Sequence, residues 1–402
     1  MTVREHGASR IPCLSQRFEL KWCARTAEIP EDLWRACFSP PREGLFWYRA
    51  LECGNLADQF TFAFGLLQVN GAPVGIVPTF LFDLPLDLVI PPAIARFVLP
   101  IARGPLRGLA FQKTFFIGNV AGEEGRIGLV PGTSLRDFVP FIHDAARVRA
   151  RTLGASMIVW KDFAAGDRAA LDELVESGRA FRTVSYPGTT IPLVSGGYGA
   201  FVATLRSERR WKINNKLRRG AKKVALATSI VTSPSQDELK EMFSLFWQTY
   251  ARGTTKFERL TPEFFAAIAE SDKSTFIVQR EASTGRMLAF MLMLDLGERV
   301  INQFIGIDYA AADGGFVYFR LFAAAYDWAC TTGARFMQSG QTGYMAKLDL
   351  GHCLVPLWNY CQHRSPVLQR VYRRVGARIT WDTLDGQLHG YLSAHPDARA
   401  AA

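Results

Sequence analysis

The same order of secondary-structure elements is predicted twice along this chain, and two similar helix endings mark the repeat. The first ending reads Arg151-Thr-Leu-Gly-Ala155 and the second reads Cys330-Thr-Thr-Gly-Ala334. Gly154 and Gly333 suit the left-handed backbone position that closes a helix, because glycine has no Cβ to clash there. The chain is therefore expected to fold as two similar units.

Each predicted unit consists of a hairpin, a third strand, a helix and a final strand. The elements of the first unit are strands over 60–69, 74–82 and 113–118, a helix over 134–152 and a strand over 156–160. The elements of the second unit are strands over 275–281, 287–295 and 300–307, a helix over 314–331 and a strand over 335–338. This order predicts an α/β fold of the α+β kind, built around mixed sheets.

The length of the chain also favours two domains, since 402 residues exceed the usual size of one hydrophobic core. We expect the first domain to span 20–190 and to lack a site of its own. The second is expected to span 191–385, with tails at 1–19 and 386–402.

The chain is expected to act in the cytoplasm. Its N-terminus carries charges throughout and has no apolar core, unlike a secretory signal. Residues 59–82 contain no charge, but Asn70-Gly71 and several further glycines and prolines would interrupt a membrane helix. The seven cysteines include no Cys-x-x-Cys pair, so no metal site is predicted.

Positive charge is concentrated between residues 206 and 223. This stretch holds nine Lys or Arg residues and one acid, whereas the rest of the chain holds 38 basic and 36 acidic residues. A local patch of this kind gathers anionic partners. In a helix, five cations would share one face: Arg209, Lys212, Lys216, Arg219 and Lys223.

These cations, with Arg210, are predicted to bind phosphate groups of a substrate. The stretch lacks the Glu partners four residues earlier that usually offset cations on a helix. Trp211 beside them is placed to stack on a base. The alternative interpretation is a solvated charged face, which is how most charge runs are used.

The repeated unit, the basic helix and the segment Ser339–Lys347 together resemble the Fem-type branch of the GNAT acyltransferase superfamily, over about residues 20–380. The motif that carries the resemblance is Gly-Gln-x-Gly-x-x-x-Lys, here Gly340, Gln341, Gly343 and Lys347. The resemblance implies an N-acyltransferase or aminoacyltransferase with no permanently bound cofactor. Its co-substrate would be an aminoacyl-tRNA or an acyl-CoA, and its acceptor would be an amine of a small metabolite, peptide or envelope precursor.

The superfamily's phosphate-binding loop is absent from both units. In its place the second unit has Gly314-Gly315 before a predicted helix, where backbone N–H groups can bind an anion. No Gly-x-Ser-x-Gly, His-Glu-x-x-His, Walker-type or Gly-x-Gly-x-x-Gly motif occurs. The absence of these motifs argues against a serine hydrolase, a zinc protease, a nucleotidase and a dehydrogenase, and leaves direct acyl transfer as a consistent activity.

Acyl transfer to an amine needs a proton acceptor, donors to the developing oxyanion and groups that position the substrates. For the oxyanion we expect Gln341 or Tyr344, and for the proton Asp349 or His352. Lys347 is placed either to bind phosphate or to extend its ammonium group to solvent, and Asp308 either to orient the amine or to form a turn.

A non-catalytic adaptor of the same fold is the competing hypothesis. Such a protein would use the basic helix to bind nucleic acid, tRNA included, or the surface of an anionic membrane in a transient contact. The strand-like segment Leu354–Trp358 is expected to add an edge strand, because Pro356 would interrupt a central one.

Overall fold

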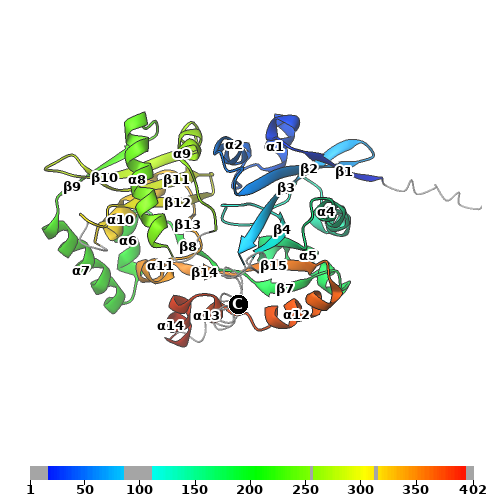
Figure 1. Ribbon diagram of the computed structural model, residues 1–402. Helices are drawn as coiled ribbons and strands as arrows, with labels where there is room; N and C mark the ends of the chain where they lie inside the picture. Colours follow the sequence, from blue (N-terminus) through cyan, green and yellow to red (C-terminus); the bar gives the residue numbers. More distant parts are fainter. Residues whose placement is uncertain (1–16, 86–110, 254–256, 312–315, 395–402) are drawn as a thin grey trace, which may run out of the picture.

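The computed structural model describes residues 17–85, 111–253, 257–311 and 316–394, which form two mixed β-sheets that stand side by side (Figure 1). The first sheet contains, in spatial order, β1 (Phe18–Cys23), β2 (Phe60–Val69), β3 (Ala72–Pro85), β4 (Phe111–Ile117), β6 (Met157–Ala164), β15 (Leu357–His363) and β7 (Phe181–Val184), with β5 (Gly128–Leu129) paired to β3. The second contains β9 (Leu226–Val231), β10 (Ser274–Glu281), β11 (Met287–Asp295), β12 (Arg299–Ile307), β13 (Phe336–Gln338), β8 (Gly188–Pro192) and β14 (Cys353–Val355).

The predicted repeat is confirmed. In each unit the third and last strands of the repeat run parallel, β4 with β6 and β12 with β13, whereas the other neighbours along both sheets are antiparallel. The connecting helices are α4 (Val139–Thr152) and α10 (Phe316–Thr331). Gly154 and Gly333 close them with φ of 74° and 84°, as expected for glycine in this position.

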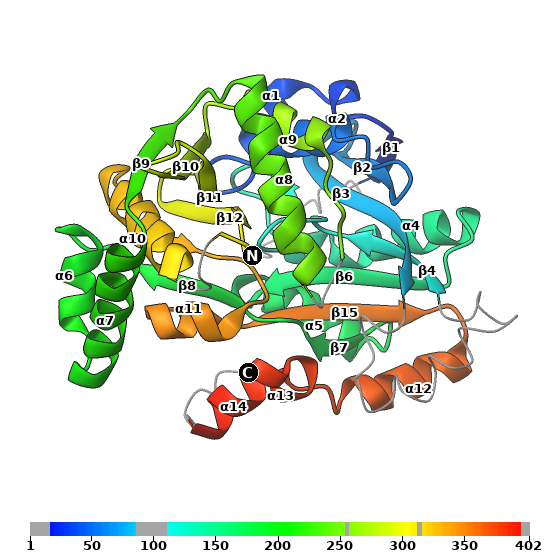
Figure 2. The same cartoon turned by 60° about the vertical axis from the view of Figure 1, so that its left-hand side comes forward.

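Further helices surround the sheets (Figure 2). Around the first sheet these are α1 (Glu31–Cys37), α2 (Leu45–Cys53), α5 (Arg168–Glu176) and α12 (Pro366–Gly376). The remaining ones are α6 (Gly197–Thr204), α7 (Ser207–Lys223), α8 (Gln236–Arg252), α9 (Pro262–Ala269), α11 (Tyr344–Leu350), α13 (Trp381–Leu384) and α14 (Gly386–Ala394). The predicted basic helix is α7, and α8 begins with a capping box formed by Ser235 and Glu238.

The two units exchange a strand. β8 follows the first unit but pairs with β13 in the second sheet, and β15 follows the second unit but lies between β6 and β7 in the first. The strand expected around Pro356 is therefore two strands, since β14 ends before this proline at a sheet edge and β15 begins after it in an interior position. The expected domain boundary at residue 190 therefore does not separate the two sheets, because β15 comes after this residue in the chain but belongs to the first sheet.

Parts of both predicted tails are ordered. β1 begins at Phe18, and α14 buries Leu388 and Leu392 against Tyr344 and Trp381. Apolar contact with the neighbouring helices therefore extends the folded region beyond residue 385. Among the described segments, no helix has the length and apolar character that crossing a membrane requires.

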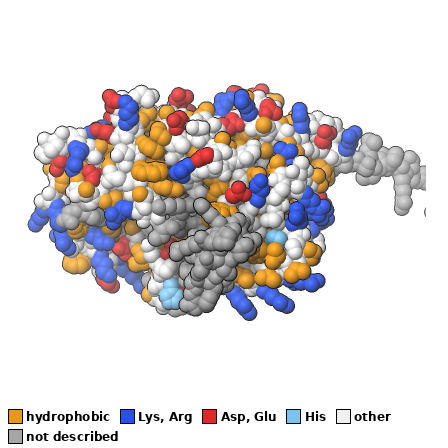
Figure 3. All heavy atoms as spheres, viewed as in Figure 1, with side chains coloured by type: hydrophobic (Ala, Val, Ile, Leu, Met, Phe, Trp, Pro, Cys, Tyr) orange, Lys and Arg blue, Asp and Glu red, His pale blue; other side chains and the backbone are white. Residues whose placement is uncertain are grey.

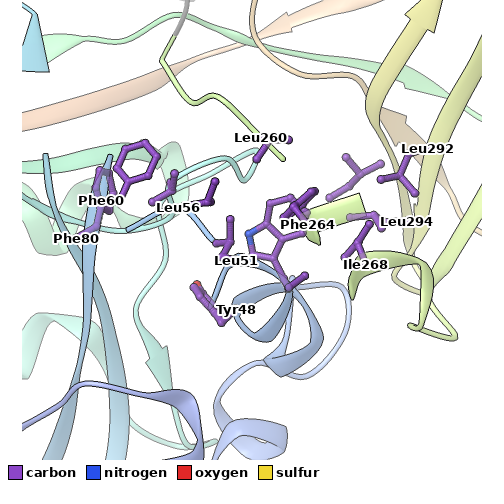
Figure 4. Close-up of a cluster of buried hydrophobic side chains, with 14 of the residues drawn as sticks. Tyr48, Leu51, Leu56, Phe60, Phe80, Leu260, Phe264, Ile268, Leu292 and Leu294 are labelled. Carbon is purple, nitrogen blue, oxygen red and sulfur yellow. The ribbon is translucent and has the colours of Figure 1, made fainter. Parts of the chain in front are cut away.

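One apolar core joins the two units (Figure 4). Tyr48 and Leu51 of α2 lie in the same cluster as Phe264 of α9 and Leu292 of β11. The Trp47 ring lies 5.7 Å from the ring of Phe264, edge to face. Shared burial of this kind fixes the two sheets relative to each other, and it positions what lies between them.

Candidate active site

A cleft of about 980 Å³ is lined by residues of both sheets. On the first side these residues come from β4, β6, β7, β15, α12 and the loop 120–123. On the second side they come from α8, β12, α10 and the segment 340–347 that follows β13. A concave space of this size between two domains is the usual place for a small-molecule site.

The segment after β13 brings four predicted residues to the cleft, namely Gly340, Gln341, Gly343 and Lys347. Gly343 caps α11 in the left-handed region, with φ of 64°. Lys347 Nζ donates to the carbonyl oxygens of Ser339 and Gly340 at 2.7 and 2.8 Å. The lysine thus folds back over the end of β13 and fixes the loop.

Glu123, in the first unit, completes this end of the cleft. It is 4% exposed, and its Oε1 accepts a hydrogen bond from the Gly340 N–H at 2.9 Å. A Cβ on Gly340 would lie 3.6 Å from Glu123 Oε1 and 3.7 Å from Lys347 Nζ, so both side chains converge on this glycine. Burial raises the pKa of Glu123, and the positive charge of Lys347 opposes that rise. Burial lowers the pKa of Lys347.

The loop that carries Glu123 is held by both units. The backbone N–H of Glu123 donates to Glu43 Oε1 at 3.2 Å. Glu43 Oε2 in turn pairs with Arg299 Nη2 of β12 at 2.7 Å. Next to it, Glu124 accepts a hydrogen bond from Gln338 Nε2 at 3.1 Å. Docking of the two units therefore determines where Glu123 lies.

Three polar atoms of cleft residues are buried and have no hydrogen-bond partner within the described parts of the chain. They are Glu123 Oε2, Gln303 Oε1 and Gln341 Nε2. Leaving such atoms unsatisfied costs about 1–3 kcal/mol each. Two acceptors and one donor in a single cleft match a bound molecule that offers hydrogen-bond donors and an acceptor.

A second polar group lies elsewhere in the same cleft. Lys161 of β6 pairs with Asp162, and its Nζ lies 5.2 Å from the centre of the Phe257 ring. Glu258 follows that phenylalanine and also lines the cleft. Burial raises the pKa of Glu258 to about 7, although Lys161 opposes the rise. Glu258 is thus a second carboxylate that can exchange protons near neutral pH.

Tyr344 and His352 do not line the cleft, in contrast to their predicted catalytic roles. Tyr344 is buried among α13 and α14, and its hydroxyl donates to Pro187 O at 2.9 Å. Tyr344 and Leu348 both pack in that cluster, whereas Lys347 of the same helix lines the cleft.

His352 is fully occupied by its neighbours. Its Nδ1 lies 2.9 Å from Lys347 O and its Nε2 lies 3.0 Å from Ser339 Oγ. Because a carbonyl only accepts, Nδ1 donates and Nε2 accepts from the serine. Burial lowers the pKa of His352 to about 3, so the ring stays neutral and supports the loop.

Two predicted acids also have structural partners. Asp308 Oδ1 accepts hydrogen bonds from the N–H groups of Ala310 and Ala311 at 3.0 and 3.1 Å, as in a turn, and the residue does not line the cleft. Asp349 pairs with Lys216 of α7 at 2.8 Å. Gly314-Gly315, the predicted anion site, lies outside the described residues.

None of the α7 cations lines the cleft. Lys212 pairs with Glu208 at 2.6 Å, a partner four residues earlier that was not expected, and Lys216 pairs with Asp349. Arg210 donates to the carbonyl of Ala203 at 3.0 Å. Lys and Arg side chains of this region nevertheless remain on the surface at the lower left of Figure 3.

The helix face reaches the cleft wall indirectly. Lys216 Nζ lies 4.1 Å from the centre of the Phe319 ring, and Phe319 lines the cleft. Arg219 and Lys223 lie over the ring of Phe316, at 5.2 and 5.1 Å. Trp211 is 60% exposed, which leaves its ring accessible.

Glu123, Glu258 and Gln303 of β12 are among the cleft residues that were not predicted from the sequence. The internal repeat offers a sequence signal that could have identified Glu123 as a candidate site residue. Residues 121–125 follow β4, and β4 corresponds to β12, which the predicted site residue Asp308 follows. Two acids between glycines at the equivalent point, Ala121-Gly-Glu-Glu-Gly125, are the feature that was overlooked.

Comparison with known protein families gives a match to part of the chain. Residues 207–345 match the family described as Acetyltransferase (GNAT) domain. Acyl transfer between an acyl donor and an acceptor is the activity that this match supports. A search of curated protein sequences gives no match.

Among solved structures, the chain is similar to FemX, with a TM-score of 0.55 and 12% identity over 88% of this chain and 100% of FemX. A tandem GNAT protein from the clavulanic acid biosynthesis pathway gives a TM-score of 0.48, with 12% identity over 87% of this chain and 99% of that one. L-PGS from Bacillus licheniformis gives 0.44, with 11% identity over 67% and 86%. The two mixed sheets and the likeness to FemX confirm the predicted fold class, mixed sheets in two tandem GNAT-like domains.

Proposed function

We propose that the protein is an N-acyltransferase that moves an acyl group directly from a phosphate-bearing carrier to an amine. The observation that carries this proposal is the set of three unpartnered atoms in the described part of the cleft, Glu123 Oε2, Gln303 Oε1 and Gln341 Nε2. An amine supplies N–H donors for the two acceptors, and an acyl carbonyl supplies an acceptor for the amide. The carrier is an acyl-CoA or an aminoacyl-tRNA.

In the proposed reaction the amine nitrogen attacks the acyl carbon, so a C–N bond forms and the C–S or C–O bond to the carrier breaks. Glu123 takes the proton that the nitrogen loses and passes it to the leaving sulfur or oxygen. Gln341 donates to the oxyanion that develops on the acyl carbon. The raised pKa of Glu123 suits a base that works near neutral pH.

Lys347 acts as a positioning residue in this proposal. Its hydrogen bonds to the carbonyls of Ser339 and Gly340 hold the N–H of Gly340 against Glu123. Its charge also limits the rise in the pKa of Glu123. Exposed cations of α7, beyond the wall formed by Phe319, are proposed to bind the phosphates of the carrier.

The test is turnover with each carrier. The full-length protein would be incubated with acetyl-CoA or with charged tRNA and a mixture of amines, and acylated amines would be detected by mass spectrometry. We expect acylation with one carrier, lowered by about 100-fold or more in Glu123→Gln. Glu298→Gln, a change at an exposed residue outside the cleft, is the matched control.

Absence of acylation with both carriers would contradict the proposal. If tRNA still bound in a strongly salt-dependent manner, that result would favour the adaptor hypothesis.

A further inference from the structure

Apolar side chains form a continuous row across four strands of the first sheet. The row consists of Phe116 on β4, Val159 on β6, Cys361 on β15 and Phe181 on β7, which pair in register. All four line the cleft. Adjacent strands are about 4.8 Å apart, so the row is about 14 Å long.

Helix α12 presents a second apolar surface to the same space. Leu368, Val371, Tyr372 and Val375 recur at the spacing of one helix face, and all of them line the cleft. The helix packs beside β7, where a Cβ on Gly376 would lie 3.1 Å from the Phe181 ring. Yet Leu368 and Val371 remain 43% and 48% exposed, so this face does not close onto the strands.

The apolar part of the cleft is continuous with its polar groups. Along β6, Met157, Val159 and Lys161 point to the same face and all line the cleft. Lys161 lies beside Phe257 and Glu258. A molecule that contacts the row at Val159 can therefore extend along β6 to these charged groups.

We infer that the row and α12 hold the long aliphatic chain of one of the two substrates. The inference rests on the proposed function and deepens it by naming a substrate class. The four side chains of the row are themselves buried, so the apolar surface still open to a ligand is mainly that of Leu368 and Val371 on α12. A short group such as acetyl would leave most of that surface without contacts. The chain belongs either to the acyl group of the donor or to a lipid-like acceptor amine.

The binding test uses isothermal titration calorimetry of the full-length protein with acetyl-, octanoyl- and dodecanoyl-CoA, and separately with butylamine, octylamine and dodecylamine. Each buried methylene should tighten binding about fourfold, so dodecanoyl-CoA should bind about two orders of magnitude more tightly than octanoyl-CoA. A chain-length effect in the CoA series assigns the chain to the donor, and one in the amine series assigns it to the acceptor. No effect in either series would overturn the inference.

Two valines of one helix provide a matched pair of variants. Val371 lines the cleft, whereas Val367 does not line it and is 66% exposed. Val371→Lys should remove most of the chain-length effect and Val367→Lys should keep it. Both positions are exposed enough to preserve folding, which a thermal melt would check. Equal behaviour of the two variants would place the chain elsewhere and overturn the inference.

Binding and turnover separate this inference from the proposed function. If long chains bind but no amine is acylated, the proposed function fails and the chain site stands. If acetyl transfer occurs without any effect of chain length on binding, the function stands and the chain site fails.

Discussion

At the scale of single residues, the cleft holds two carboxylates, Glu123 and Glu258, whose burial disfavours the charged form. Their proposed uses differ. Glu123 contacts Gly340 at the end of β13, whereas Glu258 lies near Lys161 and Phe257. The dependence of the rate on pH should report Glu123, and the dependence of stability on pH should report Glu258.

The pH dependence of the rate should report Glu123. A base must be ionised, so kcat/KM should rise with pH through the pKa of Glu123, which burial moves above the ordinary value of about 4.3. A pH–rate profile would locate this acidic limb. The limb should persist in Glu258→Gln. Its disappearance in that variant would assign the base to Glu258 instead.

Glu258 should make the protein less stable as pH rises. Its folded pKa of about 7 lies above the unfolded value, so the folded state binds the extra proton between about pH 4.3 and pH 7. The free energy of unfolding should therefore fall by about 2.5 kcal/mol between pH 5 and pH 8, relative to Glu258→Gln. Urea unfolding at both pH values measures the difference. Equal pH slopes for the two proteins would contradict the expected pKa.

His352 should matter for stability but not for the titration of activity. His352→Gln loses at least one hydrogen bond in the loop after β13, and a loss of about 1–3 kcal/mol in unfolding free energy is expected. The acidic limb of the pH–rate profile should stay where it is. A shift of that limb in His352→Gln would show that His352 takes part in proton transfer.

At the scale of elements, α7 combines paired and exposed cations, so its proposed role depends on the exposed ones. The double variant Arg218→Glu, Arg219→Glu, at two exposed positions, should weaken binding of the carrier and lower the salt dependence of log K by roughly one for each phosphate that is no longer neutralised. Lys240→Glu, on the exposed side of α8, is the control. Unchanged affinity and salt dependence in the double variant would show that α7 does not bind the carrier.

Elements were predictable where local chemistry decides them. Asn70-Gly71 forms the expected hairpin turn, with φ of 52° and 83°, and Ser235 caps α8. The roles of side chains on α11 were not predictable in the same way. Tyr344 and Lys347 belong to one short helix, and only its packing against α13 and α14 shows which of the two faces the cleft.

At the scale of the whole molecule, a buried ion pair joins the two units. Arg299 and Glu43 are 4% and 3% exposed, and Arg299 also bonds Gln338. Arg299→Met should lower the unfolding free energy by about 3–5 kcal/mol, because the Glu43 charge would stay buried without its partner. The double variant with Glu43→Met should recover much of that loss. No recovery in this double-mutant cycle would show that the pair is not the source of the loss.

The exchange of β8 and β15 shows what the sequence leaves undetermined. Both segments are short and extended, and either would satisfy its hydrogen bonds in either sheet, so the choice depends on contacts between units that are far apart in the chain. The same holds for Glu123. Its role follows from the approach of Gly340, 217 residues later, and no local pattern encodes that approach.

The most direct test of the central claim is the position of a bound donor. A crystal of the protein soaked with a non-reactive analogue of an acyl-CoA should show the acyl carbonyl within hydrogen-bond reach of Gln341 Nε2, with Glu123 beside the carbonyl carbon. Density for the acyl group away from the segment 340–347, or on the outer face of α7 alone, would contradict the claim that transfer takes place between the two sheets.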